Sequence, residues 1–383
     1  MFIIRAMPSQ PLSILEKLNP YRNPSATLEG LPNLASLNKP ENYIANTELA
    51  RAIHVALLLK KPLLITGPPG TGKTMVAASI AHQLSENKEN GVYEKPYRFT
   101  AKHDSVYKDL FYRYDSLRHF SDANTEMISI KGENPFEEIK EGTSAYDKVI
   151  FSLLDNKGRE DAYKYIDFRA FGSAILRAKL SKRESKRRSV VLIDEIDKAP
   201  RAFPNDLLEA LEDFRFMVDE TAETFDITED ELKPIVIITS NREKELPDAF
   251  LRRCIYHHIG FPEPSQLQEI IDAQLTGKNK EGLRFSSDEL DTLLGHFDHI
   301  RATIKNRKPA TAELLSWLQV LDAYREFRVD KIKTGEQGQI ERISPTEKEV
   351  LTLSYCVLLK HKDDMDRMLL EIDQSEASED PIA

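Results

Sequence analysis

Apolar positions in the middle of the chain follow two alternating patterns, one with helical spacing and one with unbroken extended runs. The helical stretches lie at 49–57, 74–84 and 207–211, and the extended runs lie at 63–66, 97–101, 190–194, 235–240 and 255–259. Short buried strands that alternate with helices are typical of a parallel sheet covered by helices on both faces. The pattern therefore predicts an α/β core.

The pattern changes at the segment FPEPSQ, residues 261–266, after which helix starts dominate. Three serines fit capping boxes ahead of apolar-periodic runs: Ser265 with Gln268, Ser286 with Glu289, and Ser344 with Glu347. This region predicts a small all-helical domain with a polar loop around 331–339.

The two ends of the chain differ from both regions. Residues 1–40 are rich in proline and predict an extension with at most a short helix at 12–18, and the acidic SEASED predicts a frayed end. The predicted organisation is an extension at 1–40, a core at 41–263, a helical lid at 264–372 and an acidic tail at 373–383.

Composition narrows the function classes. The 383 residues allow two or three domains, and 53 basic against 63 acidic residues give a net charge of −10, which argues against a general polyanion-binding surface. The two cysteines, Cys254 and Cys356, have no metal-ligand spacing and are typical of an intracellular protein. Without a sustained apolar stretch, the sequence predicts a cytoplasmic protein with no membrane span.

Residues 67–74 read GPPGTGKT, which matches G-x-x-x-x-G-K-[ST] between a predicted strand and a predicted helix. Glycines allow backbone N–H groups to surround phosphate, Lys73 can reach the terminal phosphates, and the Thr74 hydroxyl can ligate Mg²⁺. The predicted nucleotide contacts are Gly67, Pro68, Pro69, Gly70, Thr71, Gly72, Lys73 and Thr74.

Polar residues that could take part in catalysis stand at the ends of two predicted buried strands. The segment SVVLIDEID places Asp194 and Glu195 at a strand end, where Asp194 is the predicted partner of Mg²⁺ and Glu195 would polarise a water molecule. The segment IVIITSN ends in Asn241. If its strand lies between the two motif strands, Asn241 comes near the γ-phosphate; the alternative is an asparagine that closes a turn.

Three basic or polar features keep two interpretations each. Arg252 and Arg253 either favour a helix dipole or supply an arginine finger to a neighbouring subunit, and spacing alone does not separate these roles. The basic run 181–188 is either a solvated surface or a contact for nucleic acid or an acidic partner. The polar segment 121–165 is either an insertion that faces a pore or partner, or a surface loop.

The order GPPGTGKT, VVLIDEID, ITSN and LPDAFLRRC, followed by a helical domain, resembles AAA+ ATPases and within them the MoxR-like branch, over about 41–325. The resemblance implies bound ATP and Mg²⁺ and makes Asn241 the first sensor. It favours Arg253 as the arginine finger, while Arg252 replaces a more usual acidic residue. The segment RKPATAE departs from the family's second-sensor motif, where Arg307 or Lys308 could substitute.

Such enzymes generally form hexameric rings that remodel protein partners, often with an integrin-like von Willebrand A-domain protein. The resemblance therefore implies an ATP-hydrolysing, MoxR-like chaperone role. Two alternatives stay open: a nucleic-acid-stimulated motor or loader of the same superfamily, and a nucleotide-gated scaffold with negligible turnover.

Overall fold

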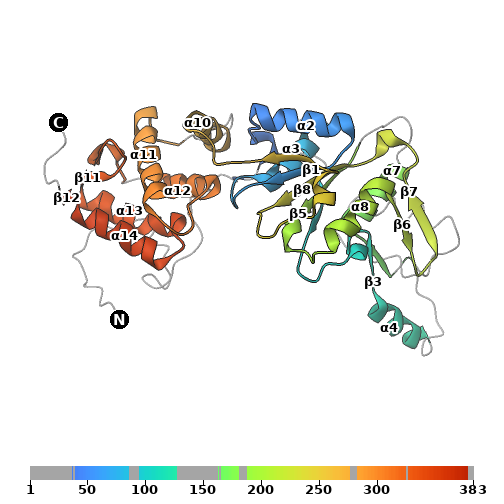
Figure 1. The fold of residues 1–383 in the computed structure, drawn as a ribbon. Helices are drawn as coiled ribbons and strands as arrows, with labels where there is room; N and C mark the ends of the chain where they lie inside the picture. The colour runs from blue at the N-terminus through green and yellow to red at the C-terminus, as the bar shows by residue number, and fades with distance from the viewer. Residues whose placement is uncertain are drawn as a thin grey trace. The chain divides into compact units, whose positions relative to one another are not determined.

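The computed structural model describes residues 37, 39–85, 95–126, 163, 165–180, 188–276, 283–324 and 327–377. These residues form two compact units that divide at Pro262 and Glu263, the core unit before this point and the C-terminal unit after it (Figure 1). The helix expected at 12–18 lies outside the described residues. No described helix combines the length and the apolar character of a membrane span.

A five-stranded sheet forms the centre of the core unit, in the order β2-β5-β8-β1-β9. Every neighbouring pair is parallel, which confirms the predicted sheet type. The strand that ends before Asn241, β8, lies between the strand of the phosphate loop, β1, and the strand of the acidic pair, β5. The strands are β1 (Leu63–Thr66), β2 (Tyr97–Thr100), β5 (Val190–Asp194), β8 (Ile235–Ser240) and β9 (Ile255–His258).

Two apolar clusters cover the two faces of this sheet, and this explains the unbroken apolar runs. Val191 and Ile193 of β5 pack into one cluster, whereas Val190 and Leu192 pack into the other. Helices α2 and α3 supply the second cluster, and α7 and α8 supply the first (Figure 1). The helices are α2 (Thr47–Leu59), α3 (Lys73–Leu84), α7 (Ala170–Leu180) and α8 (Phe203–Asp213).

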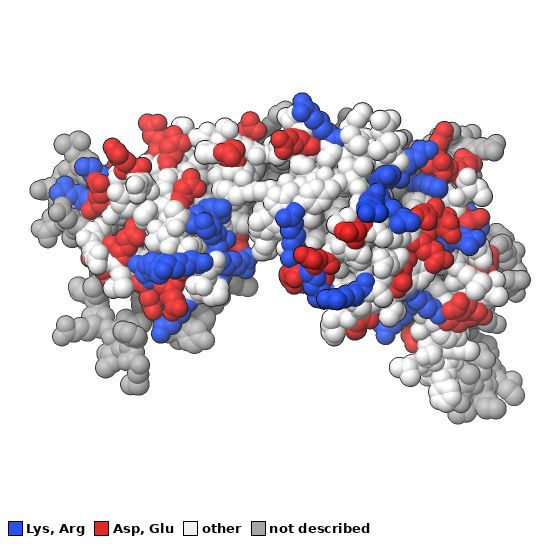
Figure 2. All heavy atoms as spheres, in the orientation of Figure 1, with Lys and Arg blue, Asp and Glu red and all other residues white. Residues whose placement is uncertain are grey.

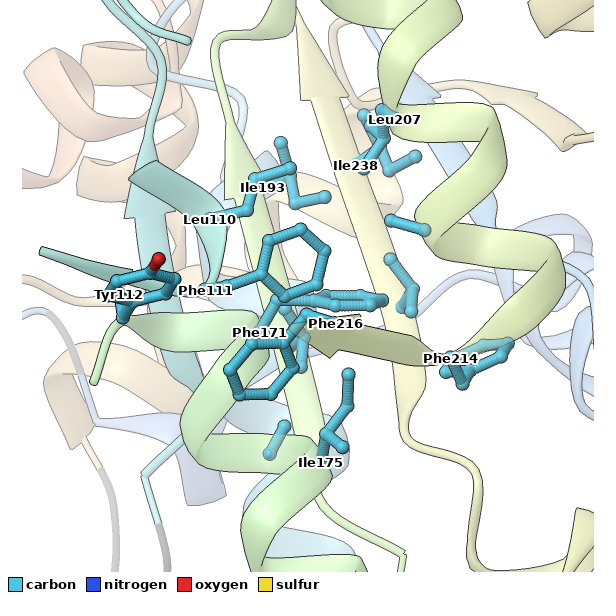
Figure 3. Packing of buried hydrophobic residues seen from close by; sticks show 14 of the residues in the cluster. Leu110, Phe111, Tyr112, Phe171, Ile175, Ile193, Leu207, Phe214, Phe216 and Ile238 are labelled. Carbon is cyan, nitrogen blue, oxygen red and sulfur yellow. The ribbon is translucent and has the colours of Figure 1, made fainter. Parts of the chain in front are cut away.

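The first cluster is rich in aromatic rings. Phe111 stacks on Phe216 with ring centroids 5.0 Å apart and meets Phe171 edge to face (Figure 3). Phe216 belongs to the antiparallel hairpin of β6 (Arg215–Val218) and β7 (Glu223–Asp226). The hairpin therefore has a structural role in closing this face of the sheet.

Shorter elements complete the core unit. Strands β3 (Tyr112–Tyr114) and β4 (Ile166–Phe168) pair antiparallel, and α4 (Ser116–Glu126) extends away from the main sheet (Figure 1). The remaining elements are η1 (Pro40–Asn42), η3 (Tyr107–Leu110), η5 (Ile196–Lys198), η6 (Asp230–Leu232) and α9 (Asp248–Leu251). Most of the predicted insertion 121–165 and residues 181–187 of the basic run lie outside the described residues.

The C-terminal unit is mainly helical, as predicted. Its helices are α10 (Pro264–Ile271), a π-helical turn (Asp272–Thr276), α11 (Ser287–Thr303), α12 (Thr311–Ala323), the short η8 (Val329–Lys331), α13 (Pro345–Leu358) and α14 (Lys362–Gln374). Trp317 of α12 is fully buried, and its indole N–H donates to the Ser354 hydroxyl of α13 over 2.8 Å. This hydrogen bond satisfies the polar atom of a side chain that otherwise fills the apolar core.

The expectation of an all-helical unit is wrong at one place. The segment taken as a polar loop at 331–339 contains strand β10 (Ile332–Thr334), which pairs antiparallel with β11 (Ile340–Ile343). Gly338, with φ of +77°, lies in the turn between them, and the buried Ile332, Ile340 and Ile343 hold the hairpin against the unit. Part of the tail predicted to fray, β12 (Glu376–Ala377), pairs with β11.

The three capping predictions have different outcomes. Ser286 forms the complete capping box with Glu289. Ser344 is the N-cap of α13, but its hydroxyl contacts the Glu347 carboxylate rather than a backbone N–H. Ser265 is not an N-cap, because Pro264 starts α10 one residue earlier with Glu263 as the N-cap.

Candidate functional site

The phosphate loop connects the end of β1 to the start of α3. Gly67 has φ of +153°, and a Cβ atom added there would lie 2.3 Å from the Ile259 carbonyl oxygen. Gly70 and Gly72 also have positive φ angles, of +80° and +83°. Only glycine adopts these conformations without strain, so the loop can turn sharply ahead of the N-terminus of α3, where an anion would be favourably bound.

Lys73 is the first residue of α3 and is only 7% exposed. Its Nζ donates to the carbonyl oxygens of Gly67 and Pro68 over 2.9 and 2.8 Å. Burial lowers the pKa of Lys73, and the negative charges of Asp194, Asp197 and Glu195 oppose this shift. Two loop carbonyls therefore hold the ammonium group, and the acidic neighbours favour its charged form.

Asp194, at the end of β5, is 4% exposed and connects the two predicted motifs. Its Oδ1 accepts from the Thr239 hydroxyl at 2.5 Å and from the Thr74 hydroxyl at 3.2 Å. Its Oδ2 accepts from the Arg98 guanidinium at 2.6 Å. The structure thus brings Thr74 and Asp194 together, as the sequence motifs predict.

The oxygen atoms of Thr74 and Asp194 fit a magnesium ion. A hydroxyl oxygen and a carboxylate oxygen meet beside a loop whose N–H groups suit phosphate, and Mg²⁺ takes oxygen ligands from the protein together with substrate phosphates. Bound there, the ion would neutralise negative charge on the phosphates.

Glu195 is separated from Asp194 by a sharp change of backbone direction. Its φ of +57° is unusual for a residue with a side chain and leads directly into the short η5 turn. Its Oε1 accepts from Asn241 Nδ2 at 3.2 Å, and its Oε2 lies 2.7 Å from Lys198 Nζ. Adjacent carboxylates therefore have different partners, which suits one for a metal and the other for water.

Asp197 joins the strand end of β8 to that of β5. It is 2% exposed and accepts from the backbone N–H groups of Asn241 and Glu243 over 3.3 and 2.9 Å. These bonds fix the peptide of Asn241 beside Glu195. Sequence reasoning missed this role, although Asp197 is the third acidic residue of the DEID segment.

Three other contacts of the acidic pair were also not predicted from sequence. Thr239 bonds Asp194 through its hydroxyl, which also accepts from the Glu195 N–H at 3.0 Å. Arg98 comes from the neighbouring strand β2, and Lys198 lies one turn after Glu195. The sequence shows polar residues at these positions, but only strand order brings Arg98 to Asp194.

The predicted arginines lie outside this network. Arg253 is exposed, and its Nε donates to Glu212 Oε1 at 2.6 Å. Arg252 is also exposed, and within the described residues its side chain makes no hydrogen bond or ion pair. In the C-terminal unit, Arg307 pairs with Glu313 at 2.9 Å and Lys308 is exposed.

Comparison with known families shows to which family the chain belongs. The family model described as "ATPase family associated with various cellular activities (AAA)" matches residues 63–263. The chain belongs to the AAA ATPase family. The matched range begins at β1 and includes the phosphate loop, the acidic pair and Asn241, so this AAA protein carries a P-loop nucleotide-binding fold.

Two solved structures show distant similarity to this AAA protein. An ATPase candidate from Cytophaga hutchinsonii ATCC 33406 has 11% identity and a TM-score of 0.36, over 88% of this chain and 92% of the other. A katanin structure, determined to explain katanin self-assembly, has 14% identity and a TM-score of 0.33, over 90% and 87%. No curated protein matches the chain.

Proposed function

We propose that this AAA protein hydrolyses ATP and that Glu195 polarises the attacking water. The observation that carries the proposal is the contact of Glu195 Oε1 with Asn241 Nδ2 at 3.2 Å, directly beside the Asp194–Thr74 pair. A carboxylate and an amide at one point can orient a water molecule between them and a terminal phosphate.

The phosphate loop supplies the binding part of the proposed reaction. Its positive-φ glycines allow backbone N–H groups to turn toward a phosphate, and the start of α3 adds the positive end of the helix dipole. Lys73 already lies against the loop and can exchange the Gly67 and Pro68 carbonyls for phosphate oxygens. The predicted contacts Gly67 to Thr74 thus remain the proposed nucleotide site, with Asp194 and Thr74 as the proposed Mg²⁺ partners.

The acidic pair supplies the chemical part. Thr239 and Thr74 hold Asp194, so this carboxylate stays at the metal position, whereas the Glu195 carboxylate bonds neither threonine and lies by Asn241. A carboxylate that accepts a proton from water raises the nucleophilicity of the water oxygen toward the γ-phosphate. Lys198 balances the charge of Glu195 between turnovers.

The substitution E195Q tests this assignment, because glutamine keeps the shape of the side chain but cannot accept the proton. We expect phosphate release to fall about 100-fold or more while binding of a fluorescent ATP analogue is retained. E209Q, at an exposed position of α8, is the matched control and should hydrolyse ATP normally. Normal turnover by E195Q would refute the role of Glu195.

The MoxR-like ring and its remodelling role form the wider part of the proposal. Arg252 and Arg253 are exposed at the end of α9, where a neighbouring subunit can reach them, and Arg253 is the preferred finger. Their function in a ring would be to stabilise charge on the neighbour's γ-phosphate. A hexamer, and a protein client such as a von Willebrand A-domain protein, are part of this proposal.

A mixing experiment shows whether the arginine acts on the ATP site of a neighbouring subunit or on that of its own subunit. E195Q and R253A should each lose activity alone, but a mixed ring would join an intact Glu195 to an intact Arg253 across an interface. We expect mixing to restore part of the ATPase activity and mass measurement to show ATP-dependent assembly. A mixture of E195Q with R252A shows which of the two arginines acts. If neither mixture recovers ATPase activity, the proposal of an arginine finger is refuted.

The net charge of −10 and the mixed charges on one face of the core unit favour a protein client over nucleic acid. On the face shown in Figure 2, acidic and basic side chains are intermixed over the core unit. A surface that binds a phosphate backbone instead gathers basic side chains. ATPase stimulation by DNA or RNA that decreases with salt would overturn this preference, and ATP binding with negligible turnover would indicate a nucleotide-gated scaffold.

A further inference from the structure

An arginine of the neighbouring strand occupies one oxygen of the proposed metal-site carboxylate. Arg98 of β2 lies with its guanidinium 2.6 Å from Asp194 Oδ2. The Asp194 side chain is 5% exposed, whereas that of Arg98 is 55% exposed. The pair therefore joins a buried acid of the site to a cation that remains accessible to solvent.

The position of Arg98 follows from strand alternation. Tyr97 and Phe99 pack against the cluster formed with α7 and α8, so Arg98 lies on the opposite face, which α3 covers. Its register partner on β5 is Leu192, two residues before Asp194. A long side chain on this face can thus extend along β5 to the carboxylate at its end.

Two threonine hydroxyls also orient Asp194. Thr239 and Thr74 both donate to Oδ1, and Thr239 itself is 1% exposed and fixed in β8. Arg98 therefore adds mainly positive charge at Oδ2. A divalent cation at the same carboxylate meets electrostatic repulsion from the guanidinium, and this repulsion is screened only in part because Asp194 is buried.

We propose that Arg98 is a positioning residue that sets the magnesium requirement of the nucleotide site by competing with Mg²⁺ for Asp194. The inference rests on the proposed ATP function. When Mg²⁺ concentration is low, Arg98 neutralises Asp194 and keeps the site intact. When the ion binds with nucleotide, the exposed guanidinium turns away from Oδ2.

The experiment measures the Mg²⁺ concentration that gives half-maximal binding of a fluorescent ATP analogue to the full chain. R98Q removes the charge, and we expect this concentration to fall about tenfold. R98K keeps the charge and should stay within about threefold of the wild type. R113Q, which removes an exposed arginine of β3 outside the main sheet, is the matched control and should not change it.

A second readout is independent of nucleotide fluorescence and of turnover. Mn²⁺ binding followed by paramagnetic resonance, with a non-hydrolysable ATP analogue, should show the same order of affinities, with R98Q tighter than wild type. If R98Q fails to fold, R98M carries the same comparison. An unchanged or increased Mg²⁺ requirement in the folded neutral variant would overturn the inference.

The failure of the two proposals is distinguishable. If the wild type binds no ATP analogue at any Mg²⁺ concentration, the proposed function fails. If the wild type binds normally and the neutral variant keeps the wild-type Mg²⁺ dependence, only the role of Arg98 fails.

Discussion

Asn241 Nδ2 donates to Glu195 Oε1 over 3.2 Å, although the two residues are 46 positions apart in the chain. The contact exists because β8 and β5 are parallel neighbours, so that their carboxyl ends open at the same edge of the sheet. Asp197 adds a second connection by accepting from the backbone N–H of Asn241. The strand end of β8 is thus fixed against the proposed water-activating group.

Removal of this amide should impair turnover more than binding. In N241A, Glu195 loses one partner while the phosphate loop is unchanged, so we expect kcat to fall about 10-fold or more with nearly constant affinity for an ATP analogue. N241D, which places a second carboxylate at Glu195, should fall further because like charges repel. Phosphate-release kinetics check both, and a variant with wild-type kcat would exclude Asn241 as a sensor.

Lys73 should be needed for ligand binding and not for folding. K73M keeps the aliphatic stem but removes an ammonium whose pKa is lowered by burial, so we expect an unliganded Tm equal to or above that of the wild type. Addition of ATP and Mg²⁺ should raise the Tm of the wild type but not that of K73M. K61M, at an exposed lysine before β1, should keep the ligand-induced increase.

Two glycines near the loop allow a matched test of backbone strain. G67A places a Cβ atom 2.3 Å from the Ile259 carbonyl oxygen at φ of +153°, so we expect a loss of about 3 kcal/mol in the free energy of unfolding. G260A, where an added Cβ meets no atom within 4 Å, should cost less than about 1 kcal/mol. Urea unfolding measures both, and equal stabilities would contradict the geometry of the loop.

His296 makes the stability of the C-terminal unit depend on pH. The ring is buried between the Gly338 carbonyl and the Tyr355 hydroxyl, at 3.1 and 2.8 Å. Burial lowers its pKa from 6.5 to about 4, opposed by the Gly338 bond and reinforced by His299. Below pH 6.5 the unfolded chain binds a proton at His296 that the folded chain does not bind. The contribution of His296 to the free energy of unfolding is therefore complete above pH 6.5 and is lost as the pH falls through about 4.

A pKa difference between 6.5 and about 4 corresponds to about 3 kcal/mol in the free energy of unfolding. Fluorescence of Trp317, which is the single tryptophan and lies in this unit, follows its unfolding at pH 7 and at pH 4.5. In H296N, which does not titrate in this range, we expect lower stability at pH 7 and a smaller loss on acidification. H361N, at an exposed histidine, is the control and should keep the wild-type dependence.

Much of the fold could be predicted because short segments of the sequence show which residues form buried strands. Strands 63–66, 190–194 and 235–240 are buried on both faces, which produces unbroken apolar runs, and their bounds in the structure agree with the sequence pattern. The hairpin at 332–343 was not predictable in the same way. Its strands are short, and their apolar residues acquire meaning only where the helices of the unit cover them.

The amino-acid sequence by itself determined the phosphate loop, the acidic pair and the polar end of β8, because each is a short segment whose residue types carry the chemistry. Tertiary structure decided which of these groups meet. Strand order placed Asn241 at Glu195 and Arg98 at Asp194, and no spacing along the chain encodes either contact. A parallel sheet joins residues through strand order rather than through sequence distance, so the partners of the acidic pair emerge only when the chain is folded.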